Sequence, residues 1–282
     1  MLNHMKLPSG AILDFSGPAL VMAVVNCNDD SFYAPSRALE EEALKKALAA
    51  EEEGAAIIDF GGESSRPGSL YVSEEEELER VIQVIRSFRK KSSLPVSVDT
   101  RKAVVARAAL DAGADIINDI SGLGDDPLMP PLCAKQNAAV ILMHKKGVPL
   151  TMQDSPGYEN LAGEIRAWFG SAVERALASG IDTGKIILDP GIGFGKTLND
   201  NLQILAMLAE FCGTDYPLLV GLSRKSFIGE ITGRSAEERL PGTLAANAAA
   251  IMGGVRIIRV HDVKEHVDLV KILHALNVGT ER

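Results

Sequence analysis

The stretch AAIIDFGGESSRPGSLYVSEEEELERVIQVIRSFRKKSSLPVSVDT, residues 55–100, contains one full repeat of the pattern that decides the fold. It begins with an apolar run, passes through a polar loop, and ends in a second apolar run. Between these runs, Ser73 and Glu76 have the spacing of a helix-capping pair, and apolar residues from Leu78 to Phe88 recur at helical spacing. Two strands separated by one helix predict a βαβ unit with parallel strands.

The same alternation runs along the whole chain. Eight short apolar runs are typical of strands whose two faces are covered, and they occupy residues 20–26, 55–61, 95–100, 114–121, 138–144, 185–191, 217–224 and 255–262. An open doubly wound sheet is the rival architecture, but it usually has fewer strands than this. Eight such units in 282 residues therefore predict an α/β fold, a single (β/α)8 TIM barrel, with residues 1–282 forming one domain.

The composition excludes several classes of protein. A formal net charge of −9 disfavours nucleic acid as a partner. The three cysteines lack metal-ligand spacing, which indicates reduced thiols and a cytoplasmic location. The first ten residues, MLNHMKLPSG, do not resemble a signal peptide, and no apolar run is long enough to span a membrane.

Polar side chains follow nearly every predicted strand, at the end that opens on the active-site mouth of a barrel. Any one of them would equally suit a helix cap or a turn. Their gathering around one mouth instead predicts a ligand site. They are Asn26, the loop GGESSRPG at 61–68, Asp99, Asn118, Asp119, His144, Asp189, Arg224, Lys225, Arg259 and His261.

One group of these residues suits a flat, nitrogen-rich heterocycle. Asp99, Asn118 and Asp189 offer acceptors and an amide to amino and ring N–H donors. Lys225 can donate to a ring carbonyl or nitrogen of the same ligand.

A second group suits an anion with several oxygens. Arg259 and His261 lie at the end of the last predicted strand. In a closed ring this strand lies beside the first strand, and the first lies beside the second, which is followed by Ser65 and Arg66. Asn26 suits an oxygen ligand of Mg²⁺, because Mg²⁺ takes few protein ligands and keeps phosphate oxygens. The sequence therefore predicts a diphosphate site with Mg²⁺ as cofactor.

Two further motifs allow other interpretations. PGIGFGKT at 190–197 resembles a nucleotide phosphate loop, but Pro190 stands where GxxxxGK[ST] needs glycine. We expect its glycines to let the backbone approach a flat ligand near Phe194 instead. The acidic run EEEELER at 74–80 is interpreted as a solvated helix face.

Taken in order, these motifs resemble the dihydropteroate synthase family. The matching pieces cover almost the whole chain: Asn26, DSF at 30–32, GGESSRPG at 61–68, SVDT at 97–100, INDI at 117–120, LMH at 142–144, LDPGIGFGK at 188–196, GLSRKS at 221–226 and RVHD at 259–262. The resemblance implies a homodimeric barrel and a sulfonamide target of folate biosynthesis. It also implies a transferase that joins 6-hydroxymethyl-7,8-dihydropterin pyrophosphate to p-aminobenzoate and releases pyrophosphate.

The resemblance also implies a role for each matching residue. Pterin contacts fall on Asp99, Asn118, Asp189 and Lys225, with Met143, Phe194 and Gly221 as walls. Pyrophosphate contacts fall on Asn26, Ser65, Arg66, Arg259 and His261, with Asn26 also on the metal. Contacts to p-aminobenzoate fall on Phe32, Ser65, Lys225 and Ser226, and the expected catalytic set is Asp99, Lys225 and Asp30.

The first loop departs from the family pattern Asn-x-Thr-Pro-Asp-Ser-Phe. Asn28 stands at the threonine and Asp29 at the proline, so the restraint that proline places on the backbone is missing. This departure favours one alternative, a non-catalytic pterin-binding paralogue. The other alternative is a pterin-binding methyltransferase of the methyltetrahydrofolate–corrinoid type, which would share the pterin residues but not need Lys225 or the cationic RVHD segment.

Overall fold

The centre of the molecule is a ring of eight parallel strands. The computed structural model of the chain describes residues 2–27, 36–64, 68–147, 151–154 and 156–280. The strand order is β8-β7-β6-β5-β4-β3-β10-β9, and a parallel bridge between Leu188 and Leu218 brings β8 beside β9. The strands are β3 (Leu20–Asn26), β4 (Ile57–Gly61), β5 (Val96–Asp99), β6 (Ile116–Asp119), β7 (Ala139–Met143), β8 (Ile186–Asp189), β9 (Leu219–Gly221) and β10 (Ile257–Val260). The predicted (β/α)8 barrel is confirmed, and the open-sheet alternative is wrong.

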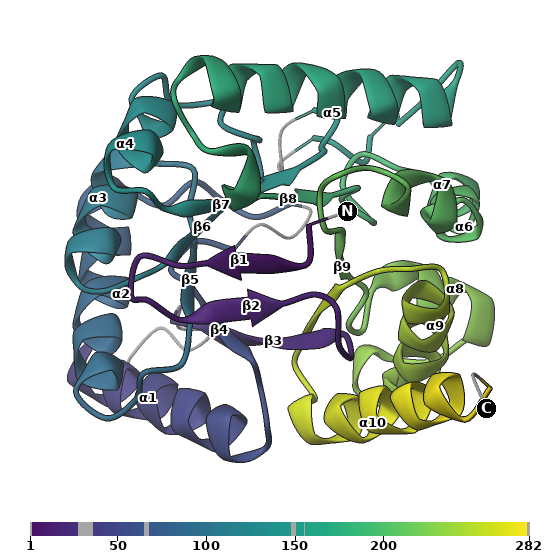
Figure 1. Cartoon of the computed structure of the whole chain (residues 1–282), viewed down its shortest axis with the longest axis horizontal. Coiled ribbons are helices and arrows are strands. Elements are labelled where there is room, and N and C mark those ends of the chain that lie inside the picture. Colours follow the sequence, from purple (N-terminus) through teal and green to yellow (C-terminus); the bar gives the residue numbers. More distant parts are fainter. Residues whose placement is uncertain (1, 28–35, 65–67, 148–150, 155, 281–282) are drawn as a thin grey trace.

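Helices surround this ring (Figure 1). The hydroxyl of Ser73 accepts a hydrogen bond from the backbone N–H of Glu76 at 3.2 Å, so the helix predicted after Ser73 begins where the capping pattern placed it. The helices are α1 (Ser36–Glu52), α2 (Glu74–Arg89), α3 (Ala103–Asp111), α4 (Met129–Lys135), α5 (Leu161–Ala178), α6 (Leu198–Ala206), α7 (Leu208–Cys212), α8 (Ser226–Thr232), α9 (Leu240–Met252) and α10 (Val263–Thr280), with 3-10 turns η1 (Thr183–Lys185) and η2 (Ala236–Glu238).

Side chains alternate between the inside and the outside of the barrel along each strand. On β4, Ile58 and Phe60 belong to the large apolar cluster that the helices cover, whereas Ile57 belongs to the interior cluster. The interior layer is made of Met22, Ile57, Ile116, Ala139, Ile141, Ile187, Leu219 and Ile257. Residues two positions further along each strand therefore also point inward, nearer the carboxyl ends of the strands.

An N-terminal hairpin closes the other end of the barrel. Strands β1 (His4–Lys6) and β2 (Ile12–Asp14) pair antiparallel and lie across the barrel strands in Figure 1. Four buried side chains of this segment, Met5, Leu7, Leu13 and Phe15, join the interior cluster. The sequence did not predict these strands, because three residues are too few to display an alternating pattern. The hairpin therefore covers the end of the barrel opposite the carboxyl ends of the strands.

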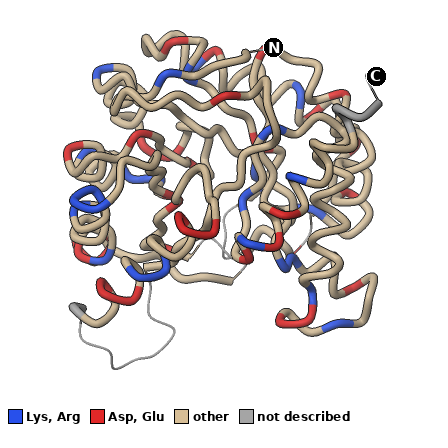
Figure 2. Tube along the Cα trace, turned by 60° about the horizontal axis from the view of Figure 1, so that its bottom comes forward, with Lys and Arg blue, Asp and Glu red and all other residues tan. Residues whose placement is uncertain are grey.

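The remaining expectations about composition concern cysteines, membrane spans and charge. Cys27, Cys133 and Cys212 are free, as predicted, and all three are buried. Within the described ranges, no helix is long and apolar enough to cross a membrane. Basic and acidic residues are interspersed along the trace in Figure 2.

Candidate active site

A buried polar cluster lies at the carboxyl ends of β4, β5, β6 and β10. The guanidinium of Arg259 donates from Nε to Oδ2 of Asp59 at 2.6 Å and from Nη2 to Oδ2 of Asp99 at 2.9 Å. The amide of Asn118 donates to the same Oδ2 of Asp59 at 3.3 Å. Three of the predicted site residues are thus brought together, with Asp59 at the centre.

Asp59 was given no role by the sequence analysis. It is fully buried, and its other oxygen, Oδ1, has no hydrogen-bond partner among the described residues. A signal was present, because a single charged residue interrupts the apolar run AAIIDFG. A buried charge of this kind is rarely kept without a partner.

A second part of the site follows β7, β8 and β9. Nζ of Lys225 lies 4.1 Å from the centroid of the Phe194 ring. Oδ1 of Asp189 accepts from the backbone N–H of Gly191 at 2.7 Å. Met143 and Phe194 belong to one small buried apolar cluster. The structure therefore places an acid, an ammonium group and an apolar wall close together.

Gly221 contributes by lacking a side chain. It pairs in register with Arg259 on the neighbouring strand, and a Cβ at Gly221 would lie 4.0 Å from Cβ of Arg259. A larger residue at this position would fill space beside the base of the Arg259 side chain.

The two carboxyl groups that face this region ionise less readily than usual. Burial raises the pKa of Asp99 to about 7; Arg259 opposes this rise, and the nearby carboxylates Asp59 and Glu77 add to it. Burial also raises the pKa of Asp189 to about 6, although the Gly191 N–H and Lys225 oppose it. Both groups therefore change protonation near neutral pH, which is common at functional sites.

The expected anion residues lie on the neighbouring strands β3 and β10. His261 is exposed, and its Nδ1 lies 2.9 Å from Oγ of Ser223. Asn26 is the exposed last residue of β3. Ser226, which we expect at the p-aminobenzoate site, is the exposed first residue of α8. The side chain of Arg259, which we expect at the anion site, is 23% exposed, and its guanidinium binds the carboxylates of Asp59 and Asp99.

Among the described residues, the donor set suits a metal that takes few protein ligands. In the described part of the chain, no three His, Cys, Asp or Glu side chains are grouped so that they could hold a metal ion. Asn26 offers a single amide oxygen. This fits Mg²⁺, which can take its other ligands from water and from a phosphate group.

Four expected site residues lie outside the described residues: Asp30, Phe32, Ser65 and Arg66. The substituted positions of the first loop, Asn28 and Asp29, lie outside them as well.

Three polar strand ends that we expected at the mouth are bound within the protein, one by its own loop and two by the loop after a neighbouring strand. The carboxylate of Asp119 accepts from the N–H groups of Ser121 at 2.7 Å and Leu123 at 3.0 Å. Arg224 pairs with Asp262 at 2.5 Å. His144 is buried and turned toward Lys196. The buried backbone groups of a tight loop need hydrogen-bond partners, and a polar side chain at a strand end, such as Asp119, can supply them.

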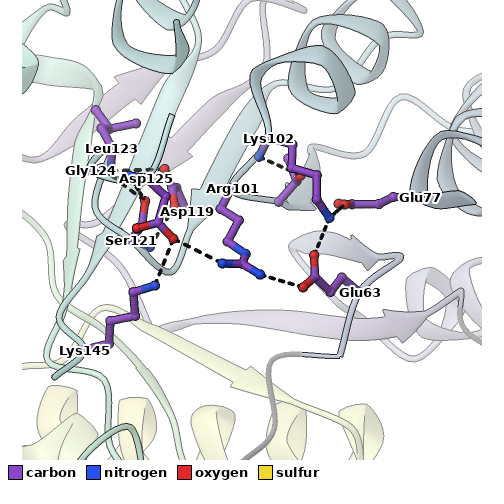
Figure 3. A network of polar contacts seen from close by, with 11 residues as sticks. Glu63, Glu77, Arg101, Lys102, Asp119, Ser121, Leu123, Gly124, Asp125 and Lys145 are labelled. Carbon is purple, nitrogen blue, oxygen red and sulfur yellow. Dashed lines mark hydrogen bonds and ion pairs between the residues drawn. The ribbon is translucent and has the colours of Figure 1, made fainter. Parts of the chain in front are cut away.

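The interpretation of EEEELER as a solvated face is wrong for Glu77. Its side chain is fully buried and pairs with the ammonium group of Lys102, which also pairs with Glu63 (Figure 3). The helical turn of α2 directs Glu77 inward, and Lys102, just beyond β5, supplies the opposite charge.

The same network continues around the rim of the barrel. Arg101 joins Glu63 at 2.9 Å to Asp125 at 3.3 Å, and Lys145 joins Asp125 at 3.0 Å (Figure 3). These residues follow β4, β5, β6 and β7 in turn. Ion pairs therefore connect the loops after four successive strands.

The glycines of PGIGFGKT approach protein backbone, which corrects the expectation that they approach a ligand. Gly191 and Gly195 have φ values of +64° and +63°. A Cβ there would lie 1.9 Å from the carbonyl oxygen of His144 and 2.1 Å from that of Lys146. Only Gly193 faces the site, where its Cβ would lie 3.3 Å from Cδ of Lys225.

Comparison with known proteins agrees with this geometry. Residues 22–261 match the family described as "Pterin binding enzyme". The chain is 44% identical to the dihydropteroate synthase of Synechocystis sp. over 96% of this chain and 94% of that protein. A Yersinia pestis dihydropteroate synthase solved with a sulfonamide drug complex is 42% identical, with a TM-score of 0.92 over 98% of this chain and 99% of that one.

A Xanthomonas albilineans dihydropteroate synthase solved with 4-aminobenzoic acid is 39% identical to this chain. Its TM-score is 0.91 over 98% of this chain and 99% of that one. The likeness covers nearly the full length of both chains. The chain therefore belongs to the family of pterin binding enzymes and, within it, to the dihydropteroate synthases.

Proposed function

We propose that this chain condenses 6-hydroxymethyl-7,8-dihydropterin pyrophosphate with p-aminobenzoate to give 7,8-dihydropteroate and pyrophosphate. The observation that carries the proposal is the convergence of Asp99, Asn118, Asp189 and Lys225 at one end of the barrel, beside His261 and Asn26. A heterocycle rich in N–H donors fits the first set, and a diphosphate fits the second.

The pterin would lie between the two carboxyl groups. Asp99 and Asp189 would accept from the amino and ring N–H groups, and the amide of Asn118 could both accept and donate. Lys225 would donate to the ring carbonyl or a ring nitrogen. Phe194 and Met143, packed together at the wall, would contact the flat face of the ring.

The diphosphate would lie toward Arg259, His261 and Asn26. Positive charge there stabilises the leaving group as negative charge develops on it. Mg²⁺ would be held by Asn26 together with phosphate oxygens, and when bound it would supply further positive charge to the diphosphate. Ser65 and Arg66 are assigned to the same anion on sequence grounds alone.

The reaction is a displacement at the pterin methylene carbon. The bond from this carbon to the diphosphate oxygen breaks, and the aniline nitrogen forms the new C–N bond and then loses a proton to solvent. Asp99 and Asp189 would stabilise positive charge that develops on the pterin during bond breaking. An aniline is largely unprotonated at neutral pH, so a strong general base is not required.

The site for p-aminobenzoate is assigned to Phe32, Ser65, Lys225 and Ser226. Lys225 belongs to both substrate sites, and Ser226 follows it at the start of α8. Asp30 would help to order the first loop near the metal. These assignments rest on the motifs and on the position of Lys225 beside Phe194.

We also propose that the chain acts in the cytoplasm as a homodimer and has no nucleic-acid or membrane partner. Support comes from the net charge of −9, the free buried cysteines and the resemblance to the family.

One assay tests the proposed function. Purified protein is supplied with pterin pyrophosphate and Mg²⁺, and pyrophosphate release is followed with and without p-aminobenzoate. The proposal expects release that depends on p-aminobenzoate and is strongly reduced in Asp99→Asn. A non-catalytic paralogue would bind pterin and release nothing in either condition.

A further inference from the structure

The lysine of PGIGFGKT has no part in the proposed mechanism, yet it is one of the largest buried side chains of the molecule. Lys196 is only 2% exposed. A phosphate-binding lysine would extend from its loop toward a ligand. Here the side chain folds back beneath the loop that carries it.

The ammonium group of Lys196 is surrounded by neutral acceptors. It has three N–H donors. Its three shortest contacts are the carbonyl oxygen of Gly191 at 2.9 Å, Nδ1 of His144 at 3.0 Å and the carbonyl oxygen of Phe194 at 3.1 Å. The carbonyl oxygen of His144 lies at 3.4 Å. The donors of one ammonium group are therefore matched by the loop and by the residue that follows β7.

These contacts reach the part of the loop next to Asp189 and the part that carries Phe194. The N–H of Gly191 is held by Asp189 and its carbonyl by Lys196. The carbonyl of Phe194 is held by Lys196, and its ring lies beside Nζ of Lys225. One side chain thus fixes both the segment next to the acid and the segment that carries the apolar wall.

We propose that Lys196 is a positioning residue for pterin binding: it acts as an internal hydrogen-bond donor that sets the places of Asp189 and Phe194. This inference rests on the proposed function, because it concerns the same pterin site. Lys196 itself does not touch the substrate.

Burial of this lysine is costly, which favours a functional reason for keeping it. Desolvation, together with the charge of Lys225, lowers the pKa of Lys196 to about 7, although Asp189 and Asp200 oppose the shift. Burial likewise lowers the pKa of His144 to about 3, so its ring is neutral at physiological pH and Nδ1 can accept from Lys196. A lysine used only for packing could be replaced by an apolar residue of similar length with no effect on the ligand.

The chain offers a matched control at the other end of the same strand. Lys185 precedes β8 and is 9% exposed, and its Nζ donates to the carbonyl oxygen of Lys6. It therefore shares burial and backbone acceptors with Lys196 but lies at the plugged end of the barrel. Lys185→Met removes a buried lysine without touching the loop.

The experiment compares wild type, Lys196→Met and Lys185→Met, after circular dichroism has shown that each is folded. Calorimetry measures the Kd of 6-hydroxymethylpterin, a probe without phosphate, and steady-state kinetics measure the KM of p-aminobenzoate at saturating pterin pyrophosphate. We expect Lys196→Met to raise the pterin Kd by about tenfold or more, and to change the p-aminobenzoate KM by less than about twofold. Lys185→Met should lower thermal stability and leave both constants within about twofold.

Equal pterin Kd values for wild type and Lys196→Met would overturn the inference and leave the proposed function standing. If wild type itself does not bind the pterin, the proposed function fails, and the inference fails with it. Should Lys196→Met not fold, His144→Phe decides, since it removes one acceptor while keeping an aromatic ring against Trp168. It should raise the pterin Kd by about threefold to tenfold, and an unchanged Kd would count against the inference.

Discussion

Arg259 on β10 binds Asp59 on β4 across the width of β3, with Nε 2.6 Å from Oδ2. Asp59 is fully buried, and the same oxygen also accepts from Asn118. Nη2 of the same guanidinium donates a hydrogen bond to Oδ2 of Asp99. The position of the two carboxylates and the amide therefore depends on one ion pair inside the barrel.

Removing Asp59 should destabilise the fold, because the charge of Arg259 would be left largely buried without its nearest partner. Asp59→Ala should lower the free energy of unfolding by about 3 kcal/mol, as is typical when one partner of a buried pair is removed. Urea denaturation measures this change. The exposed pair Arg166–Glu210 is the control, and Glu210→Ala should cost less than about 1 kcal/mol. A similar decrease in the free energy of unfolding for both variants would show that the buried Asp59 pair stabilises the fold no more than an exposed pair.

The anion site can be separated from the pterin site at His261. This residue is exposed and contacts Ser223, whereas Arg259 is tied to Asp59 and Asp99. His261→Ala should weaken binding of pterin pyrophosphate by about tenfold and leave a non-phosphorylated pterin nearly unaffected. Arg259→Ala should weaken both ligands, because it also disturbs the pterin carboxylate. Calorimetry with the two ligands decides, and equal losses in His261→Ala would remove it from the anion site.

Pterin binding should release protons near neutral pH. Burial raises the pKa of Asp99 to about 7, so this group is partly protonated in the free protein, and ligand N–H donors favour its charged form. Calorimetry at pH 6.5 in buffers of different ionisation enthalpy should therefore report proton release. Asp99→Asn should reduce the release and leave only the part due to Asp189. Equal release by wild type and Asp99→Asn would contradict this assignment.

The same pKa has a consequence for stability. The folded state binds a proton at Asp99 more tightly than the unfolded chain, whose aspartates have a pKa of about 3.9. The contribution of Asp99 is thus fully present below about pH 4 and is lost as pH rises through about 7. Relative to Asp99→Asn, wild type should lose stability over this range in thermal melts. A difference that stays constant between pH 4 and pH 7 would show that the pKa of Asp99 is unshifted.

Much of the barrel was predictable, because apolar runs and capped helices alternate along the sequence. The position of the eight strands follows from this pattern, since strands covered on both faces need continuous apolar runs. The hairpin before β3 was not predictable, because its three-residue strands owe their existence to packing under the barrel.

The site was predictable to a smaller extent. Strand ends identify Asp99, Asn118, Asp189 and Arg259 as neighbours, since parallel strands end at one mouth. Sequence does not reveal which polar groups are used within the protein. Glu77 differs from its expected role because Lys102, from the loop after another strand, pairs with it, and Asp119 differs because it binds the backbone of its own loop.

The glycine loop supplies a further test. Gly191 has a φ of +64°, and a Cβ there would lie 1.9 Å from a backbone oxygen that cannot easily move. Gly191→Ala should lower the free energy of unfolding by more than about 2 kcal/mol and abolish pterin binding. Gly170 on α5 has nothing within 4 Å of its Cβ position, so Gly170→Ala should be neutral or stabilising by up to about 1 kcal/mol. Chemical denaturation and pterin calorimetry on both variants check this pair, and a Gly191→Ala protein with native stability would refute the packing of the loop.

The central claim is that the convergent site performs the condensation and does not merely bind pterin. The most direct measurement is quantification of 7,8-dihydropteroate and pyrophosphate in the same reaction, with purified wild type and Asp99→Asn. The account predicts equal amounts of the two products from wild type, formation of both only when p-aminobenzoate is present, and at least about tenfold less of both from Asp99→Asn. Wild-type protein that binds the pterin but forms no dihydropteroate would contradict it.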